Sequence, residues 1–290
     1  MPEIVEVRTD AEDLDFYLSY RNLEEITFCN DLFKNKCKGI EELNNQLPLQ
    51  IECVMSKAKK IFIKLISINN EQTNNRTENQ NTWWLIITYG MTGKISINKR
   101  KHSHIYFKMS ESYIGFTNFY YENARRIGYV IATNDPNEYK SQLYDMNKQF
   151  ALEYSVEGFG KITLKEFIEN IKKAKNTYLV KSLMDQRTLG SGIGNYLLSE
   201  IMYDVKLNPD IKCSELNDND IQKLYESIEK IILLSYEYGG VSMRDYTHIN
   251  ETHGSFEKQL KVYDKDGSKD EYGRIIKVKL GKHGRNIWYV

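Results

Sequence analysis

The first residues of the chain hold three groups that could do chemistry together, at Pro2, Glu3 and Glu6. If Met1 is removed, Pro2 presents a free secondary amine, a nucleophile that no other residue can supply. An α-amine titrates at about 7.7–8.0, so an appreciable fraction is neutral near pH 7. A structural explanation competes, because proline suits the first turn of a helix and carboxylates there complement the helix dipole. On these residues alone the structural explanation is favoured.

A second stretch that could bind a ligand is the glycine-rich "LGSGIGNYLLSE", in which Gly190, Gly192 and Gly194 alternate just before Asn195. Glycine turns at a helix start expose backbone N–H groups that suit a phosphate. A dinucleotide fingerprint requires a preceding strand. Here a helical stretch, "VKSLMDQ", precedes the glycines, so we exclude that class. A helix, tight turns and a second helix indicate a site that binds a nucleic-acid backbone, in which Asn195 bonds a phosphate. The alternative is an ordinary corner between two helices.

The surrounding elements predict an α+β protein. Residues 3–22 have the pattern of a helix, and residues 47–132 contain alternating aromatic and β-branched runs such as "IFIKLISI", "WWLIITY", "HIYFKM" and "YIGFT". We expect an N-terminal antiparallel β-sandwich with a leading helix, interrupted by the polar tract "NNEQTNNRTENQNT" as a disordered loop. The second half has helical periodicity in "LKEFIENIKKAK" and "DIQKLYESIEKIILLSYEY", and the tail "RIIKVKLGKHGRNIWYV" predicts a β-hairpin. The predicted domains are 1–150 and 151–290.

Composition sets limits on the class of protein. The 290 residues are 41% hydrophobic and 28% charged, which is typical of a globular chain, and no apolar run is long enough for a membrane span. The start lacks the pattern of a secretory signal, and the four cysteines contain no C-x-x-C pair, so neither a zinc site nor a redox dithiol is indicated. The net charge is zero, yet residues 94–108 hold five basic residues and no acid. A neutral total can therefore hide a basic face that binds phosphate, although a mosaic of solvated surfaces is favoured on charge alone.

Several segments, in order, resemble the formamidopyrimidine-DNA glycosylase and endonuclease VIII family of DNA repair enzymes. The family begins M-P-E-x-x-E-V, and this chain begins "MPEIVEV". Family segments R-x-A-K-x-L-L-L-x-L, H-x-G-M-[ST]-G and D-P-R-R-F-G resemble "KAKKIFIKL", "TYGMTG" and "NARRIG". The family signatures G-x-G-N-x-x-x-x-E and Q-x-x-x-V-Y-x-x-x-G resemble "GIGNYLLSE" and "KQLKVYDKDG". The matches span nearly the whole chain, so coincidence is improbable.

The C-terminal hairpin departs from the usual family pattern. Typical members end in a zinc finger with four cysteines, and none of those cysteines is present in "GRIIKVKLGKHGRNIWYV". The hairpin, within about 255–290, resembles the zincless finger of the vertebrate and viral endonuclease VIII-like branch. We therefore expect no metal and no other cofactor. Arg285 is at the position of the family's finger arginine, and a guanidinium there could hold a phosphate with a bidentate fork.

The resemblance implies a glycosylase coupled to an abasic-site lyase that cuts by β,δ-elimination. Pro2 would attack the sugar C1′ and form a Schiff base, Glu3 would donate a proton to the ring oxygen, and Glu6 would orient the site. Lys59 would hold a phosphate beside the lesion. The predicted catalytic residues are thus Pro2, Glu3, Glu6 and Lys59, and the predicted DNA contacts are Lys60, Gly192, Gly194, Asn195 and Arg285.

The resemblance also predicts which side chains fill the gap left by an extruded base. These wedge residues are Met91 and Arg126, with Ile127 in place of the family's phenylalanine. The zincless hairpin and the altered wedge favour oxidised pyrimidines and ring-opened purines as substrates. The segment 244–262 would enclose the flipped base. Tyr89 replaces the histidine of the family motif.

Two other functions compete with this prediction. A catalytically inactive protein of the same fold could bind damaged DNA, and a tautomerase-like enzyme could use the Pro2 amine as a base, although tautomerase chains are far shorter. We expect damaged DNA as the partner, double-stranded and with acceptance of single strands open, bound by a monomer with no membrane association. The expected location is intracellular: the nucleus, or the viral factory or cytoplasm if the genome is viral.

Overall fold

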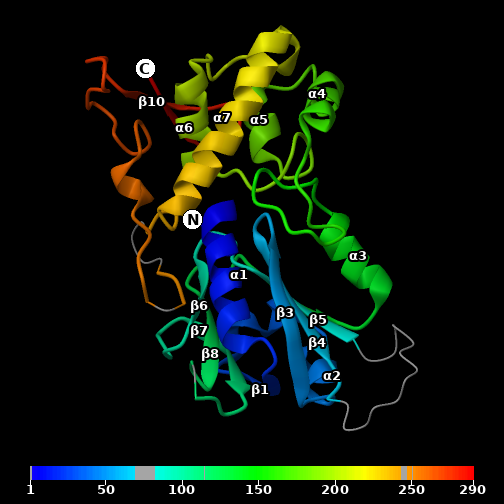
Figure 1. The fold of residues 1–290 in the computed structure, drawn as a ribbon. Coiled ribbons are helices and arrows are strands. Elements are labelled where there is room, and N and C mark those ends of the chain that lie inside the picture. Colours follow the sequence, from blue (N-terminus) through cyan, green and yellow to red (C-terminus); the bar gives the residue numbers. More distant parts are fainter. Residues whose placement is uncertain (1, 69–81, 114, 243–246, 250) are drawn as a thin grey trace. The chain divides into compact units, whose positions relative to one another are not determined.

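The computed structural model describes residues 2–68, 82–113, 115–242, 247–249 and 251–290 (Figure 1). These residues form two compact units. Unit 1 contains Pro2, residues 6–143 and the described part of 243–253, and unit 2 contains Glu3–Val5, Tyr144–Ser242 and Gly254–Val290. Unlike the predicted ranges 1–150 and 151–290, both units include a segment from the other half of the chain. The predicted α+β class, with an N-terminal sheet and a C-terminal helical domain, is confirmed.

Unit 1 is built on the predicted leading helix and on a mainly antiparallel sheet. Helix α1 spans Ile4–Leu18, and its residues Val7, Ala11, Leu14 and Leu18, spaced at helical periodicity, are buried in the core. The strands are β1 (Asn22–Phe28), β2 (Cys37–Lys38), β3 (Leu49–Lys57), β4 (Lys60–Ile66), β5 (Thr82–Thr88), β6 (Gly93–Ser96), β7 (Ser103–Met109), β8 (Asn118–Asn123) and β9 (Val130–Thr133). Figure 1 shows β6–β8 on one side of α1 and β3–β5 on the other. Helix α1 therefore fills the interior of the folded sheet.

The strands join in the order β2-β9-β5-β4-β3-β1-β7-β8-β6. Neighbours are antiparallel except β2 and β9, which are parallel. Short helical segments lie between strands at η1 (Asp31–Lys36) and α2 (Ile40–Asn44), and α3 (Pro136–Tyr144) follows β9. The predicted strand in "YIGFT" is wrong: β8 begins only at Asn118, and Gly115 has a φ of +92°, which suits a turn. The polar tract at 69–82 lies outside the described residues except for Thr82, which begins β5.

Unit 2 contains the predicted helices and the terminal hairpin. The helices are α4 (Leu164–Lys173), α5 (Leu179–Met184), α6 (Asn195–Val205) and α7 (Asp218–Glu237), with 3-10 turns η2 (Cys213–Glu215) and η3 (Phe256–Lys258). Capping boxes start α4, at Thr163 and Glu166, and α7, at Asn217 and Asp220. The hairpin β10 (Lys277–Leu280) and β11 (Asn286–Tyr289) is confirmed. No helix in the described ranges has the length and apolarity to cross a bilayer.

Candidate active site and nucleic-acid interface

The carboxylate of Glu3 lies at the N-terminus of α6. Its Oε2 accepts a hydrogen bond from the backbone N–H of Gly194 at 2.6 Å, and its Oε1 accepts one from Tyr196 at 3.0 Å. The side chain is buried. Helix α6 has no cap from its own N-cap residue, Gly194, so the distant carboxylate satisfies N–H groups that would otherwise lack acceptors. The positive end of the helix dipole also stabilises negative charge there.

Two glycines leave the space that Glu3 and its neighbour occupy. A Cβ on Gly194 would lie 2.2 Å from Cδ of Glu3, and a Cβ on Gly192 would lie 2.7 Å from Cβ of Ile4. Gly192 also has a φ of +113°, and its carbonyl accepts from the N–H of Ile4 at 3.1 Å. The glycines in the turn before α6 therefore allow the backbone after Pro2 to pack closely against this turn.

This use of the turn corrects the prediction of a phosphate-binding glycine loop. The N–H of Gly194 donates to Glu3, and the N–H of Gly192 donates to Oε1 of Gln186 at 2.7 Å. Both donors already have acceptors inside the protein, so the two amides are not offered to a phosphate. The absence of side chains at Gly194 and Gly192 leaves space for Glu3 and Ile4, respectively.

Asn195 joins the turn before α6 to the C-terminal hairpin. Its Nδ2 donates to the carbonyl of Asn286 at 3.0 Å, and its Oδ1 lies 3.0 Å from Nε2 of His283. Arg285, next to Asn286, is exposed at the hairpin turn, where its carbonyl accepts from the N–H of Gly281. The structure therefore brings the predicted residues Asn195 and Arg285 into one region of unit 2.

His283 is a member of this region that sequence reasoning missed. Burial, and then the charge of Arg285, lower the pKa of His283 below its usual range. A neutral ring suits a half-buried position beside a guanidinium. The only sequence signal was its place in the turn "GKHG", which does not distinguish it from an ordinary surface histidine.

The three predicted wedge residues lie on two turns that contact each other. Met91 is in the turn between β5 and β6, and Arg126 and Ile127 are in the segment between β8 and β9. A Cβ on Gly90 would lie 3.2 Å from Cβ of Ile127, which shows how close the two turns are. Ile127 is 52% exposed and Arg126 is also exposed, so both can reach a ligand.

Asn123 holds these two turns together, and sequence reasoning missed it. The side chain is fully buried at the end of β8. Its Nδ2 donates to the carbonyl of Tyr89 at 3.2 Å, and its Oδ1 accepts from Thr92 Oγ1 at 3.0 Å and from the N–H of Arg126 at 2.9 Å. Asn123 thus fixes the positions of the Met91 turn and the Arg126 segment at once.

Lys59 and Lys60 have different surroundings in the β3–β4 hairpin. Lys59 is half-buried in the two-residue turn, after Ala58 with a φ of +51°. Lys60 is buried, and its Nζ donates to the carbonyl of Gln142 at 3.0 Å and to its Oε1 at 3.1 Å. Gln142 is in the last turn of α3, where a cation satisfies carbonyls and complements the dipole. The predicted DNA contact at Lys60 is therefore replaced by a structural contact within unit 1.

The remaining predicted catalytic residues are near the start of the chain. Pro2 is buried and precedes α1, and Glu6 is buried in the first turn of α1. Residue 1 lies outside the described residues, as do 244–246 and 250 of the predicted base-enclosing segment 244–262. Among the described residues no group of three or more His, Cys, Asp or Glu side chains could hold a metal ion.

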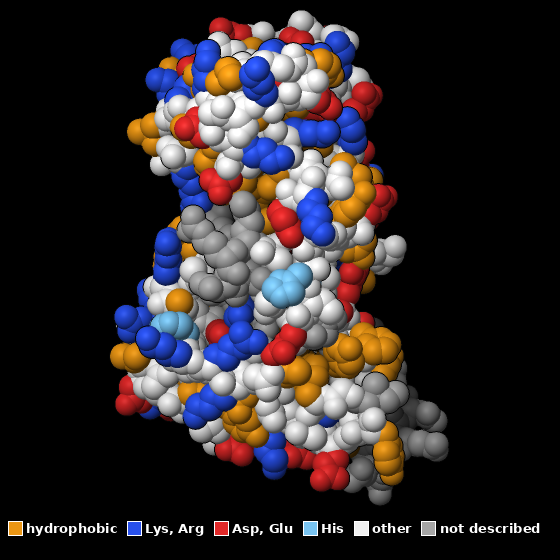
Figure 2. Space-filling view, turned by 90° about the vertical axis from the view of Figure 1, so that its left-hand side faces the viewer, with side chains coloured by type: hydrophobic (Ala, Val, Ile, Leu, Met, Phe, Trp, Pro, Cys, Tyr) orange, Lys and Arg blue, Asp and Glu red, His pale blue; other side chains and the backbone are white. Residues whose placement is uncertain are grey.

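Basic side chains gather on unit 1 over β6–β8 (Figure 2). Of the basic run at 94–108, Lys94 is buried, Arg100 pairs with Glu251 at 2.9 Å and Lys108 pairs with Glu24 at 3.0 Å. Lys99 and Lys101 are exposed. Only part of the basic run 94–108 is therefore accessible to a ligand.

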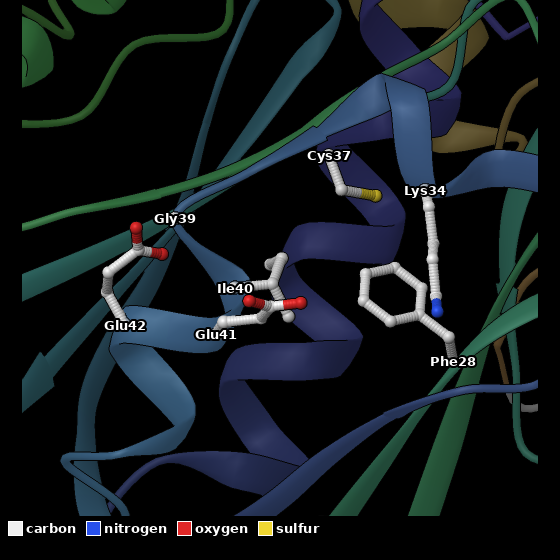
Figure 3. Close-up of a pocket in the computed structure, with 7 residues that line it drawn as sticks. All are labelled: Phe28, Lys34, Cys37, Gly39, Ile40, Glu41 and Glu42. Carbon is white, nitrogen blue, oxygen red and sulfur yellow. The ribbon is translucent and has the colours of Figure 1, made fainter. Parts of the chain in front are cut away.

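A pocket at the other end of unit 1 contains none of the predicted site residues (Figure 3). It is lined by Phe28, Lys34, Cys37, Gly39, Ile40, Glu41 and Glu42. Burial raises the pKa of Cys37 to about 12, so this thiol is not a nucleophile near neutral pH. Lys34 pairs with Asp31 at 2.8 Å. The pocket offers no chemistry that competes with the Glu3 region.

Two family models match the chain. The formamidopyrimidine-DNA glycosylase N-terminal domain matches residues 1–130, and the formamidopyrimidine-DNA glycosylase H2TH domain matches residues 157–247. A formamidopyrimidine-DNA glycosylase of Rickettsia africae is 25% identical over 297 residues, covering 100% of this chain and 97% of the relative. The enzyme of the same name from Carboxydothermus hydrogenoformans is 26% identical over 274 residues, covering 92% and 90%.

Solved structures of similar proteins have the same fold. The MutM (Fpg) protein of Thermus thermophilus superposes with a TM-score of 0.80 at 19% identity, covering 100% of this chain and 97% of that one. A Lactococcus lactis Fpg variant in complex with a DNA that contains Fapy-dG gives a TM-score of 0.79 at 22% identity, covering 99% and 97%.

Proposed function

The chain belongs to the formamidopyrimidine-DNA glycosylase and endonuclease VIII family of base-excision repair enzymes, and on that premise we propose that it is a bifunctional glycosylase and abasic-site lyase. It binds damaged DNA, excises an oxidised base and then cuts the strand through a Schiff base on Pro2. The observation that carries this proposal is the fixed carboxylate of Glu3, held by Gly194 and Tyr196 directly after Pro2.

The reaction begins with the Pro2 amine, once Met1 has been removed. Its nitrogen lone pair forms a bond to C1′, and the damaged base leaves with the electrons of the glycosidic bond. The nitrogen then gives up its proton, its lone pair forms the C=N bond, and the C1′–O4′ bond breaks as O4′ takes a proton. The product is an iminium ion, which is cationic without any added proton because the proline nitrogen is secondary. Glu3 is the neighbouring group that carries this proton, a role typically worth about 10²–10⁴-fold in rate.

Strand cleavage follows from the iminium ion. It withdraws electrons from C2′, a proton leaves C2′, and the 3′-phosphate departs with the electrons of its C–O bond. A second elimination releases the 5′-phosphate, and water then hydrolyses the imine and regenerates the amine. Glu3 accepts and returns protons in these steps, and Glu6 helps to orient the start of α1.

The remaining residues bind and deform the DNA. Arg285 and the Asn195 region hold phosphates through the hairpin, and Lys59 holds a phosphate beside the lesion. Met91, Arg126 and Ile127 enter the space that the extruded base leaves. Their contacts there offset part of the cost of extrusion, which is on the order of a few kcal/mol. The solved relative that holds damaged DNA supports DNA as the partner.

The finer substrate preference is part of the proposal. We infer that a monomer acts on oxidised pyrimidines and ring-opened purines in double-stranded DNA; acceptance of single strands is left open. Support comes from the hairpin without cysteines, which resembles the zincless finger, and from Ile127, which replaces the phenylalanine of the family motif.

The proposal is tested by trapping the Schiff base. The mature protein is incubated with DNA that carries an abasic site and is reduced with borohydride, which should yield a covalent protein–DNA adduct. A matched protein with an uncleaved N-terminal tag keeps every lysine but has no free Pro2 amine, and it should give no adduct. Tight binding without an adduct would instead establish the inactive DNA-binding alternative.

A further inference from the structure

Three buried polar side chains form a chain of contacts in unit 1, outside the groups assigned above. The hydroxyl of Tyr89 donates to Oδ2 of Asp10 at 2.8 Å, and Nδ1 of His248 lies 3.1 Å from Oδ1 of Asp10. Asp10 is 0% exposed, and the other two side chains are also buried. They come from helix α1, from the residue after β5 and from the segment 247–249.

The charges in this cluster explain why it holds together. Burial, and then Asp10, raise the pKa of Tyr89 well above its usual value, so the phenol keeps its proton and donates it. A buried carboxylate is costly unless it is paired and hydrogen-bonded, and Asp10 has one partner on each oxygen. Asp13 lies nearby: burial, then Asp10, raise the pKa of its carboxyl, and His248 opposes this. Removing Asp10 would take a hydrogen-bond partner from two buried side chains.

The cluster of Asp10, Tyr89 and His248 connects three elements whose relative positions matter for the proposed site. Tyr89 directly precedes Gly90 and Met91, so it begins the turn that carries the predicted wedge. Asp10 is one helical turn after Glu6 on α1. The hydrogen bond from Tyr89 to Asp10 therefore fixes the turn that carries Met91 to α1.

The third element, the segment 247–249, is held by further contacts besides the one between His248 and Asp10. Ile249, next to His248, is buried in the core of unit 1. Glu251 accepts from Arg100 Nη2 at 2.9 Å and from Asn98 Nδ2 at 2.7 Å. An apolar anchor and an ion pair therefore hold this segment on either side of residue 250.

We propose that Asp10 is a positioning residue for base excision: by binding Tyr89 and His248 it sets the Met91 turn and the 247–249 segment against α1. This inference rests on the proposed function. Misplacement by about 1 Å can cost roughly 10²-fold in rate. The effect is selective, because a wedge is needed to extrude a base from a duplex, whereas a single-stranded abasic site has no base to extrude.

The test compares two reactions of each variant under single-turnover conditions. These are excision of an oxidised pyrimidine from duplex DNA and cleavage of an abasic site in a single strand. Asp10→Asn should lower excision by roughly 10–100-fold and change cleavage by less than about 3-fold. Tyr89→Phe removes one hydroxyl without changing the packing, so it should act in the same direction and serves if Asp10→Asn does not fold.

Two further variants separate positioning from loss of stability. His248→Asn keeps a donor near the place of Nδ1 and should recover much of the excision that His248→Leu loses. Glu12→Gln, on the same helix, removes a carboxylate that pairs with Arg8 at 2.6 Å and should leave both reactions unchanged.

The outcomes are distinguishable. Equal loss of both reactions in step with the melting temperature, or no change in either, overturns the positioning role of Asp10. If the unsubstituted protein neither cleaves the abasic strand nor forms the borohydride adduct, the proposed function itself fails, and with it this inference.

Discussion

Glu3 and Gly194 are joined by a hydrogen bond of 2.6 Å across a sequence separation of 191 residues. The bond places the carboxylate that follows the predicted nucleophile at the start of helix α6. The amide that would have bound a phosphate in a simple glycine loop binds this carboxylate instead. Residues Glu3–Val5 and the turn before α6 are therefore parts of the same compact unit, unit 2.

Gly194→Ala should strongly slow strand cleavage while the protein remains folded. The new Cβ would lie 2.2 Å from Cδ of Glu3, so the carboxylate must move away from α6. We expect a loss of about 10²-fold or more in the single-turnover rate, because the proposed proton donor is displaced. Gly160→Ala is the matched control, since a Cβ there meets nothing within 4 Å. Full activity in Gly194→Ala would exclude a role for the position of Glu3.

Arg285→Ala should weaken DNA binding in a salt-dependent way. Loss of one phosphate contact reduces the slope of log K against log salt concentration by about 0.9. Binding isotherms at several salt concentrations, with a tetrahydrofuran-containing duplex, measure this slope. Lys172→Ala changes an exposed lysine of α4 and should leave the slope unaltered. An unchanged slope in Arg285→Ala would remove the hairpin from the proposed interface.

Asn123→Ala should reduce both stability and base excision. The substitution removes the side-chain hydrogen bonds to Tyr89, Thr92 and Arg126, and each bond lost should cost about 0.5–1.5 kcal/mol. Chemical denaturation measures the free energy of unfolding. The rate of base excision from duplex DNA measures the effect on the wedge residues. Asn118→Ala, in the same strand, removes one bond to Ile97 and should cost much less. Similar losses in the two variants would argue against a special role for Asn123.

The free energy of unfolding should fall as the pH is lowered below the ordinary histidine pKa of about 6.5. The pKa of His283 is lowered in the folded protein by burial and by Arg285, so the unfolded chain binds more protons in this range. Stability therefore rises with pH through the window between the folded and unfolded pKa values and is lost on acidification. His283→Gln should flatten this dependence in denaturation curves taken from about pH 5 to about pH 8. A curve with the same slope as the parent would show that His283 does not contribute.

Local patterns predicted much of the fold. The periodicity of α4 and α7, the alternation in β4, β5 and β7, and the glycine turn of the C-terminal hairpin all depend on residues a few positions apart. The segment "YIGFT" failed because an aromatic, β-branched composition resembles a strand, whereas Gly115 with its positive φ makes a turn. Propensity alone does not reveal such a backbone constraint.

The candidate site was predicted less completely than the fold. Pro2, Glu3, Asn195 and Arg285 were predicted from short motifs that follow one another along the chain, and their functional roles stay predictions. Asn123 and His283 were missed, because the sequence does not distinguish an asparagine or a histidine with specific partners from an ordinary exposed one. The structural contact of Lys60 with Gln142 was missed for the same reason.

The sequence by itself determined which residues could react and which segments become helices or strands, because both properties depend on residue type and near neighbours. Only the tertiary structure decided that Glu3 caps α6, that Gly192 and Gly194 use their amides inside the protein, and that Asp10 joins Tyr89 to His248. These contacts connect distant parts of the chain. Their donors and acceptors meet only after the core has set the path of the backbone, so no local pattern encodes them.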